Sequence, residues 1–150
     1  MDNIFKKLHY KDHKEIVVWN APASFEENIK SIADKSVVKR DVAENDKIEF
    51  FIGFVTQQSQ VNEVTNRFAS KLVGDAVFWL CYPKKTSQRY ICEFNRDKGW
   101  DVLGKYDLEG VRQVAIDEDW VALRFRKIQY LVGAYCRETK TKRKRASKKV

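Results

Sequence analysis

Three short apolar runs within the first 82 residues of the chain constrain its fold more than any other feature. They read "EIVVW" at 15–19, "KIEFFIGFV" at 47–55 and "AVFWLCY" at 76–82. Each is rich in β-branched and aromatic residues and has the length of a strand, well below the roughly 18 residues of a membrane span. Because neither face of these runs is polar, they predict strands buried on both sides, as in a parallel sheet.

Amphipathic segments follow the first two runs. Apolar residues at 25–35 share one helical face, and those at 58–72 recur at spacings of three and four, which predicts a helix in each segment. Thr56 or Ser59 is the expected N-cap of the second helix. Two weaker elements are expected, a helix near 100–106 and a short edge strand at 36–42.

The later part of the chain predicts a hairpin. Strands are expected at 111–116 and 120–126, around the polar turn "DEDW". The second strand alternates with a period of two, which places Trp120 and Arg124 on its more polar face, where they could stack on each other or contact a partner. Strands that alternate with helices and end in a hairpin predict a three-layer Rossmann-like α/β fold, with a mainly parallel sheet and a C-terminal antiparallel hairpin.

Positive charge is concentrated at the C-terminus. The chain has 29 Lys and Arg against 21 Asp and Glu, a net charge of +8. Residues 137–150 hold eight of the basic residues and one acid, a net of +7, which leaves +1 for residues 1–136. We therefore expect one Rossmann-like domain at 1–136 and a disordered basic tail at 137–150.

The tail allows two interpretations. Its densest part could bind the phosphate backbone of a nucleic acid without sequence preference. It could equally be a solubilising end with no dedicated target. The residues proposed for nucleic-acid contact are Lys142, Arg143, Lys144 and Arg145.

Cysteine usage and the N-terminus predict a cytoplasmic location. The N-terminal segment lacks an apolar signal region. Cys81, Cys92 and Cys136 are odd in number and widely spaced, which favours reduced thiols over a disulfide framework or a zinc site.

Four motifs resemble a small bacterial family described only as a domain of unknown function. They are "NAP..F" at 20–25, "WLCYPKKTS" at 79–87, "NRDKGW" at 95–100 and "VAIDEDWVALRFR" at 114–126. The resemblance extends from about residue 4 to 127. It implies the class I S-adenosylmethionine-dependent methyltransferase fold in reduced form, and the family brings no assigned activity.

The chain departs from the methyltransferase pattern at the cofactor turn. In methyltransferases the first strand leads into a glycine-rich turn, whereas this chain has no glycine at 20–24 and has Pro22 in the turn. The resemblance also implies an acid after the second strand for the ribose hydroxyls, and Asp41 and Glu44 are weak substitutes. These departures favour a non-catalytic binding or interaction module without a cofactor. The alternative is an S-adenosylmethionine-dependent methyltransferase with an atypical cofactor turn.

The loop after the third apolar run is the candidate site. In open α/β sheets, ligands bind outside the carboxyl ends of the strands. Lysines and hydroxyl groups in this loop could bind an anionic small molecule or a protein partner. The turn after the first apolar run, which begins at Asn20, could add hydrogen-bond donors. The alternative is that this loop is a solvated turn that binds no ligand. The candidate ligand-binding residues are Asn20, Tyr82, Lys84, Lys85, Thr86, Ser87 and Arg96.

No catalytic or metal-binding residue is predicted. His9 and His13 stand four apart, a spacing that could bind a metal, but a solvated pair is favoured. The acids at 117–119 are interpreted as turn residues and not as an acid–base pair. Cys81, inside an apolar run, is interpreted as an inert core thiol.

Overall fold

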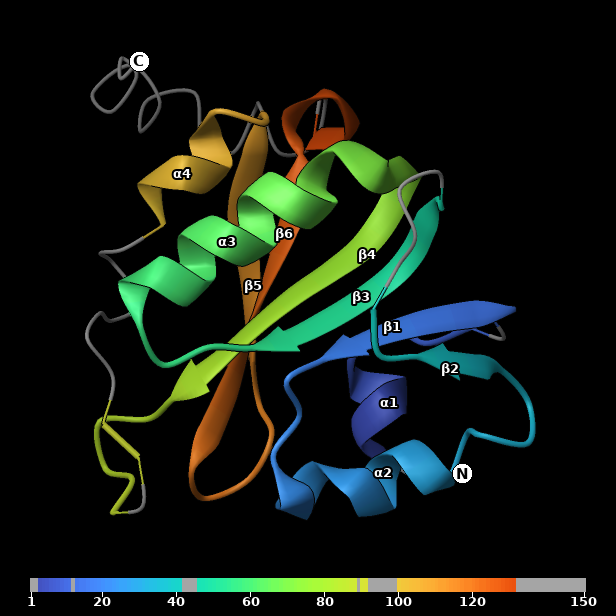
Figure 1. Ribbon diagram of the computed structural model, residues 1–150, viewed down its shortest axis with the longest axis vertical. Helices are drawn as coiled ribbons and strands as arrows, with labels where there is room; N and C mark the ends of the chain where they lie inside the picture. The colour runs from blue at the N-terminus through green and yellow to red at the C-terminus, as the bar shows by residue number, and fades with distance from the viewer. Residues whose placement is uncertain (1–2, 12, 42–45, 89, 92–99, 132–150) are drawn as a thin grey trace.

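The computed structural model describes residues 3–11, 13–41, 46–88, 90–91 and 100–131. Within these residues, six strands form one sheet in the order β2-β1-β3-β4-β6-β5 (Figure 1). The first four in this order are parallel, and β6 and β5 are antiparallel to their neighbours. The strands are β1 (Glu15–Trp19), β2 (Val37–Lys39), β3 (Ile48–Phe54), β4 (Leu72–Pro83), β5 (Leu108–Ala115) and β6 (Trp120–Lys127).

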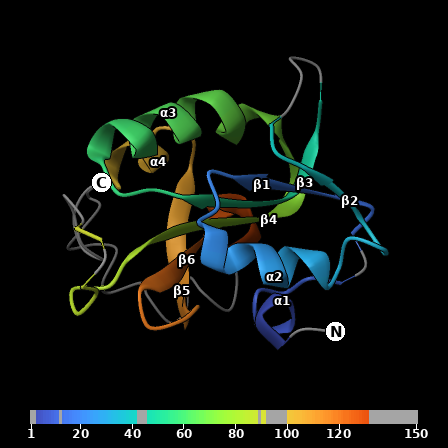
Figure 2. The ribbon, with the colours of Figure 1, turned by 60° about the horizontal axis from the view of Figure 1, so that its bottom comes forward.

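Helices cover both faces of the sheet. One face carries α3 (Gln58–Phe68) and α4 (Asp101–Gly104), and the other carries α1 (Asn3–Lys7) and α2 (Glu26–Lys30) (Figure 2). Short 3-10 turns complete the connections, at η1 (Ala23–Phe25), η2 (Ala69–Lys71) and η3 (Ile128–Leu131). The predicted three-layer Rossmann-like fold with a C-terminal antiparallel hairpin is therefore confirmed.

The central strands explain the continuous apolar runs. In β4, Phe78 and Leu80 belong to the core beneath α3, whereas Trp79 and Cys81 belong to the core beneath α1 and α2. All four side chains are fully buried. Burial raises the pKa of the Cys81 thiol well above its ordinary value, which agrees with an inert core thiol.

Several boundaries differ from the sequence prediction. The helix expected at 25–35 consists of η1 and the five residues of α2, and the helix expected at 58–72 stops being α-helical at Phe68. Strand β4 begins at Leu72, which pairs with Ile48 before the register slips by three residues. Gly74, with φ of 56°, lies in that slip. The expected edge strand is present as β2, so the unit between β1 and β3 is shortened but not lost.

The expected polar face of β6 is buried. Trp120 is 3 % exposed and Arg124 is 7 % exposed. Trp120 lies in the core beneath α1 and α2, and Arg124 has its Nη1 hydrogen-bonded to His9, next to α1. The prediction was wrong because α1, whose Lys6 and Lys7 obscure its apolar side, was not predicted as a covering element.

Parts of the prediction lie outside the described residues, including the tail at 137–150, Cys92 and Cys136. Across the part of the chain that is described, no helix is both long and apolar enough to cross a membrane.

Candidate functional site

The carboxyl ends of β1 and β3 form the switch point of the sheet. The chain leaves β1 toward α2 on one face and leaves β3 toward α3 on the opposite face (Figure 2). The two strands are adjacent and parallel, with Trp19 level with Gly53. In open α/β sheets, ligands bind in the crevice at such a point.

The turn after β1 has the backbone conformation that glycine usually provides. Asn20 has φ of 60°, in the left-handed region, where asparagine is among the few tolerated side chains. Its Nδ2 donates a hydrogen bond to the carbonyl oxygen of Phe54, at 2.9 Å. The bond joins the ends of β1 and β3. The turn therefore adopts the left-handed backbone conformation although it contains no glycine.

The residues after Asn20 are small. Pro22 is extended, with φ of −72° and ψ of 160°, and its carbonyl accepts a hydrogen bond from the Phe25 amide at 2.9 Å. Ala23 and Ser24, at the start of η1, are exposed. The turn thus presents an accessible surface with little side-chain bulk.

The N-terminus of α3 is closed by its own side chains. Gln57 and Gln60 form a capping box, and Oε1 of Gln60 accepts hydrogen bonds from the amides of Thr56 at 2.7 Å and Gln57 at 3.1 Å. The cap is therefore Gln57 and not Thr56 or Ser59. Because these amides are already paired, they are not available to an anion.

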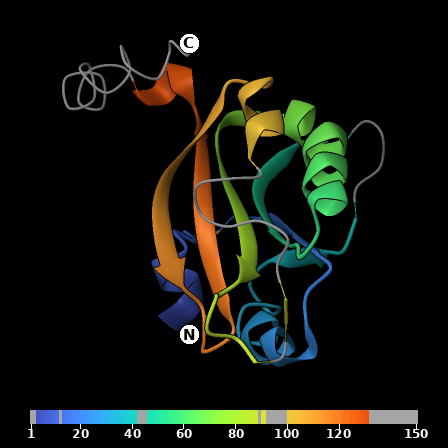
Figure 3. The same cartoon turned by 90° about the vertical axis from the view of Figure 1, so that its left-hand side faces the viewer.

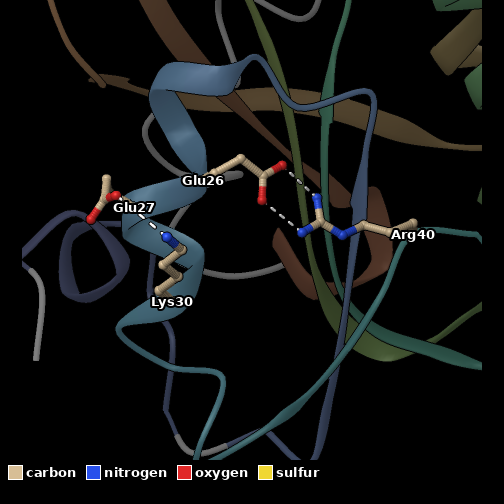
Figure 4. Close-up of polar contacts among 4 residues, drawn as sticks. All are labelled: Glu26, Glu27, Lys30 and Arg40. Carbon is tan, nitrogen blue, oxygen red and sulfur yellow. Dashed lines mark hydrogen bonds and ion pairs between the residues drawn. The ribbon is translucent and has the colours of Figure 1, made fainter.

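The end of β2 carries paired charges. Arg40 donates two hydrogen bonds to Glu26 in the first turn of α2, at 2.8 and 2.9 Å (Figure 4). These bonds lower the pKa of Glu26 and raise that of Arg40. Asp41, a weak substitute for a ribose-binding acid, accepts from Nη2 of Arg67 on α3 at 2.7 and 3.0 Å. The other substitute, Glu44, lies outside the described residues.

The lysine loop is tied to the hairpin. The amide of Lys84 donates to the carbonyl of Asp119 at 2.8 Å, and Oγ of Ser87 donates to Oδ1 of Asp119 at 2.9 Å. Lys85 and Thr86 are exposed, and Lys84 is half-buried. The two lysines and Thr86 thus face solvent from an anchored turn, whereas the Ser87 hydroxyl already serves the protein.

Tyr82 does not join the lysine loop. It is buried on the α3 face of β4, where its hydroxyl accepts a hydrogen bond from Nε2 of Gln113 at 2.8 Å. Its ring packs edge-on against Trp100, with centroids 5.4 Å apart. Arg96, the remaining predicted ligand, lies outside the described residues.

The turn and the lysine loop share one edge of the sheet but are not in contact range. With β3 between them, the ends of β1 and β4 lie about 10 Å apart across the sheet. Trp19, Gly53 and Leu80 are level. Lys84 therefore stands three residues further along its strand than Asn20, about another 10 Å. Only an extended ligand, or two ligands, can touch both.

An aromatic row, which the sequence analysis missed, connects the two loops on the α2 side. Ring centroids lie 4.9 Å apart for Phe25 and Phe54, 5.1 Å for Phe54 and Trp120, and 4.8 Å for Trp120 and Tyr90. Nε1 of Trp120 is buried and finds no hydrogen-bond partner within the described ranges. Aromatic residues at the ends of β3 and β6 were the available signal for this row.

His9 is hydrogen-bonded within the fold. Nδ1 of His9 lies 2.7 Å from Nη1 of Arg124, and since arginine can only donate, His9 accepts and is neutral. The favoured solvated pair is therefore wrong for His9. No group of three or more His, Cys, Asp or Glu that could hold a metal is found in the described parts of the chain. The acids at 117–119 form a turn, as predicted, with Oδ1 of Asp117 accepting from the amides of Asp119 and Trp120.

Acidification is expected to destabilise the fold through His9. Burial, followed by the positive charges of Arg124, Arg112, Lys11 and Arg126, lowers the pKa of His9. An unfolded histidine ionises near pH ~6.5, so below that pH the unfolded chain binds more protons and the free energy of unfolding falls. Melting temperatures should therefore drop between pH ~7.5 and ~5.5. The drop should be smaller in His9→Gln, and equal drops in both proteins would contradict this role.

The sheet order, the switch point and the antiparallel hairpin define a protein with the class I methyltransferase fold. A solved S-adenosylmethionine-dependent methyltransferase from Aquifex aeolicus matches with a TM-score of 0.55 and 11 % identity, over 83 % of this chain and 87 % of that one. The N-methyltransferase NodS from Bradyrhizobium japonicum WM9 matches with a TM-score of 0.50 and 10 % identity, over 76 % and 85 %. At these identities the likeness is one of fold. No family model matches the chain, and no curated protein does.

Proposed function

We propose that this chain binds S-adenosylmethionine at the switch point and acts as a methyltransferase. The observation that carries the proposal is the left-handed Asn20, held by its hydrogen bond to Phe54 where β1 and β3 end. The likeness of fold to methyltransferases supports it. When bound, the cofactor supplies a methyl group on a sulfonium, which an acceptor nucleophile takes.

The turn fits this cofactor better than the end of β2 does. Backbone at 20–24, with exposed Ala23 and Ser24, is accessible to a nucleoside. After β2, however, the carboxylate of Asp41 is held by Arg67, and Lys39 pairs with Glu15 and Asp46. The ribose hydroxyls thus lack an uncommitted acid among the described residues at this point. We expect weaker binding than in methyltransferases that follow the full pattern.

Thermal unfolding with S-adenosylhomocysteine tests the proposal. A ligand at ten times its dissociation constant stabilises the native state by about 1.4 kcal/mol, which is a rise of about 3–6 °C for a chain of this size. Ala23→Trp adds bulk over the turn and should raise the dissociation constant at least about tenfold. Ala33→Trp, an exposed alanine after α2, is the matched control and should bind normally.

Two outcomes would contradict cofactor binding at the turn. One is the absence of any shift in the wild-type protein, and the other is an equal shift in Ala23→Trp. A shift with inorganic pyrophosphate that is lost in Lys84→Ser with Lys85→Ser, but not in Lys6→Ser with Lys7→Ser, would favour the second candidate. Such a shift, together with no response to S-adenosylhomocysteine, would indicate a non-catalytic module that binds anions at the lysine loop.

The specific observation behind the second candidate is the anchored turn. Lys84 and Lys85 extend from a loop fixed to Asp119, and their ammonium groups make no ion pair with any residue in the described ranges. The two candidates are compatible in space, because the lysines stand beyond the turn, where an anionic acceptor could sit. Nucleic-acid contact through Lys142, Arg143, Lys144 and Arg145 is an accessory prediction that concerns residues outside the described ranges.

A further inference from the structure

Arg124 is a buried cation without an anionic partner in the described parts of the chain. It lies in the middle of β6 and is 7 % exposed. Its one hydrogen bond with the described residues joins Nη1 to the neutral Nδ1 of His9, at 2.7 Å. Nε is buried and has no hydrogen-bond partner among the residues that the structure describes. The Nε–H donor of the guanidinium is therefore unsatisfied by the described residues.

A second arginine stands beside it. The register of β5 and β6 pairs Arg112 with Arg124, so their side chains emerge on the same face of the sheet. Arg112 is exposed and forms no ion pair with any residue that the structure describes. Arg126, two residues further along β6, is by contrast bound to Asp75, with Nε 3.0 Å from Oδ1. The unmatched charge thus belongs to Arg112 and Arg124.

This arrangement is costly as it stands. Burial, and then the nearby Arg126 and Arg112, lower the pKa of Arg124, while Asp75 opposes that shift. An arginine nevertheless stays charged in proteins, so a buried and incompletely bonded guanidinium lowers stability. An oxyanion between the two arginines would remove both defects, because the Nε and Nη2 edge of a guanidinium binds two oxygens side by side.

We propose that the face of β5 and β6 beside α1 binds one phosphate-like oxyanion between Arg124 and Arg112. The site lies on the face opposite α3 and α4, near the free edge formed by β5 (Figure 3). It is separate from the switch point, since β6 and β1 are three strand spacings apart, about 14 Å. Because Nε is covered, binding turns the Arg124 side chain toward Arg112 or moves the segment at His9 aside.

The experiment uses the full chain and inorganic sulfate, which keeps its charge between pH 5 and 8. Melting temperature and calorimetric binding are measured with a few millimolar sulfate against sodium chloride of equal ionic strength, so that general salt effects cancel. The wild-type protein should bind saturably. Arg112→Gln, an exposed change, should raise the dissociation constant about tenfold, as expected for the loss of one charge-assisted hydrogen bond. Arg124→Met should abolish binding.

Lys105→Gln is the matched control, because Lys105 is exposed just after α4 on the opposite face. If Arg124→Met fails to fold, Arg112→Gln still decides the question. Absence of saturable binding, or equal binding by Arg112→Gln and the wild-type protein, would overturn the proposal. Inorganic phosphate and O-phosphoserine then distinguish the sources. Binding of both indicates a phosphoryl group carried on a larger molecule, and binding of phosphate alone indicates a free ion.

Discussion

Replacing Trp79 by alanine is expected to lower the free energy of unfolding by about 3–5 kcal/mol, the usual cost of removing a large buried aromatic side chain. Trp79 is fully buried in β4. Its Nε1 donates a hydrogen bond to the carbonyl oxygen of Leu8 at 2.8 Å. Its ring packs edge-on against the His9 ring, with centroids 6.2 Å apart. The substitution therefore opens a cavity and also releases the end of α1 from the sheet.

Urea denaturation followed by circular dichroism measures this loss. Trp79→Phe is the matched control, because it keeps a ring and removes the N–H group. Its expected cost is about 1–3 kcal/mol, from the unpaired Leu8 carbonyl and the smaller ring. A loss below about 1 kcal/mol for the alanine variant would mean that α1 does not pack on β4 as described.

Asn20→Ala is expected to cost about 1.5–3.5 kcal/mol. Alanine at φ near 60° carries a strain of about 1–2 kcal/mol, and the hydrogen bond to Phe54 contributes roughly 0.5–1.5 kcal/mol more. Asn20→Gly removes the hydrogen bond, but glycine tolerates φ near 60° without strain. Its expected cost is therefore only that of the hydrogen bond, roughly 0.5–1.5 kcal/mol. The difference between the two variants isolates the left-handed backbone.

The same pair of variants bears on the proposed cofactor site. Asn20→Gly should still bind S-adenosylhomocysteine, because the turn keeps its course. Denaturation gives the stabilities, and calorimetry gives the affinities. Equal stability of the glycine and alanine variants would contradict a left-handed residue at this position, and with it the observation on which the cofactor site depends.

Sequence reasoning located most strands because apolar runs buried on both faces are unambiguous. It misjudged the bounds and the burial of elements that depend on contacts between residues far apart in sequence. Strand β4 was expected to start at residue 76, because Gly74 and Asp75 read as a break, yet Leu72 pairs with Ile48 before the slip. Arg124 was assigned to a polar face on residue type alone, whereas a strand between β4 and β5 is covered wherever a helix reaches it.

The sequence predicted that the loops of the candidate site lie together, but it did not predict their hydrogen bonds. The loops containing Asn20 and Lys84 do lie at the same edge of the sheet, as the parallel strands require. The alternation within β4 could have shown that Tyr82 faces α3 and not the loop. The use of Ser87 by Asp119 could not be predicted, because that contact joins residues 32 apart in sequence.

The anchoring of the lysine loop on Asp119 ties the position of that loop to the length of the hairpin between β5 and β6. The Lys84 amide and the Ser87 hydroxyl both depend on where β6 begins. Lengthening or shortening the turn at 116–119 would therefore shift Lys84 and Lys85 together relative to the switch point. A change in hairpin length alone would thus move the proposed anion site relative to the proposed cofactor turn, without any substitution in the loop itself.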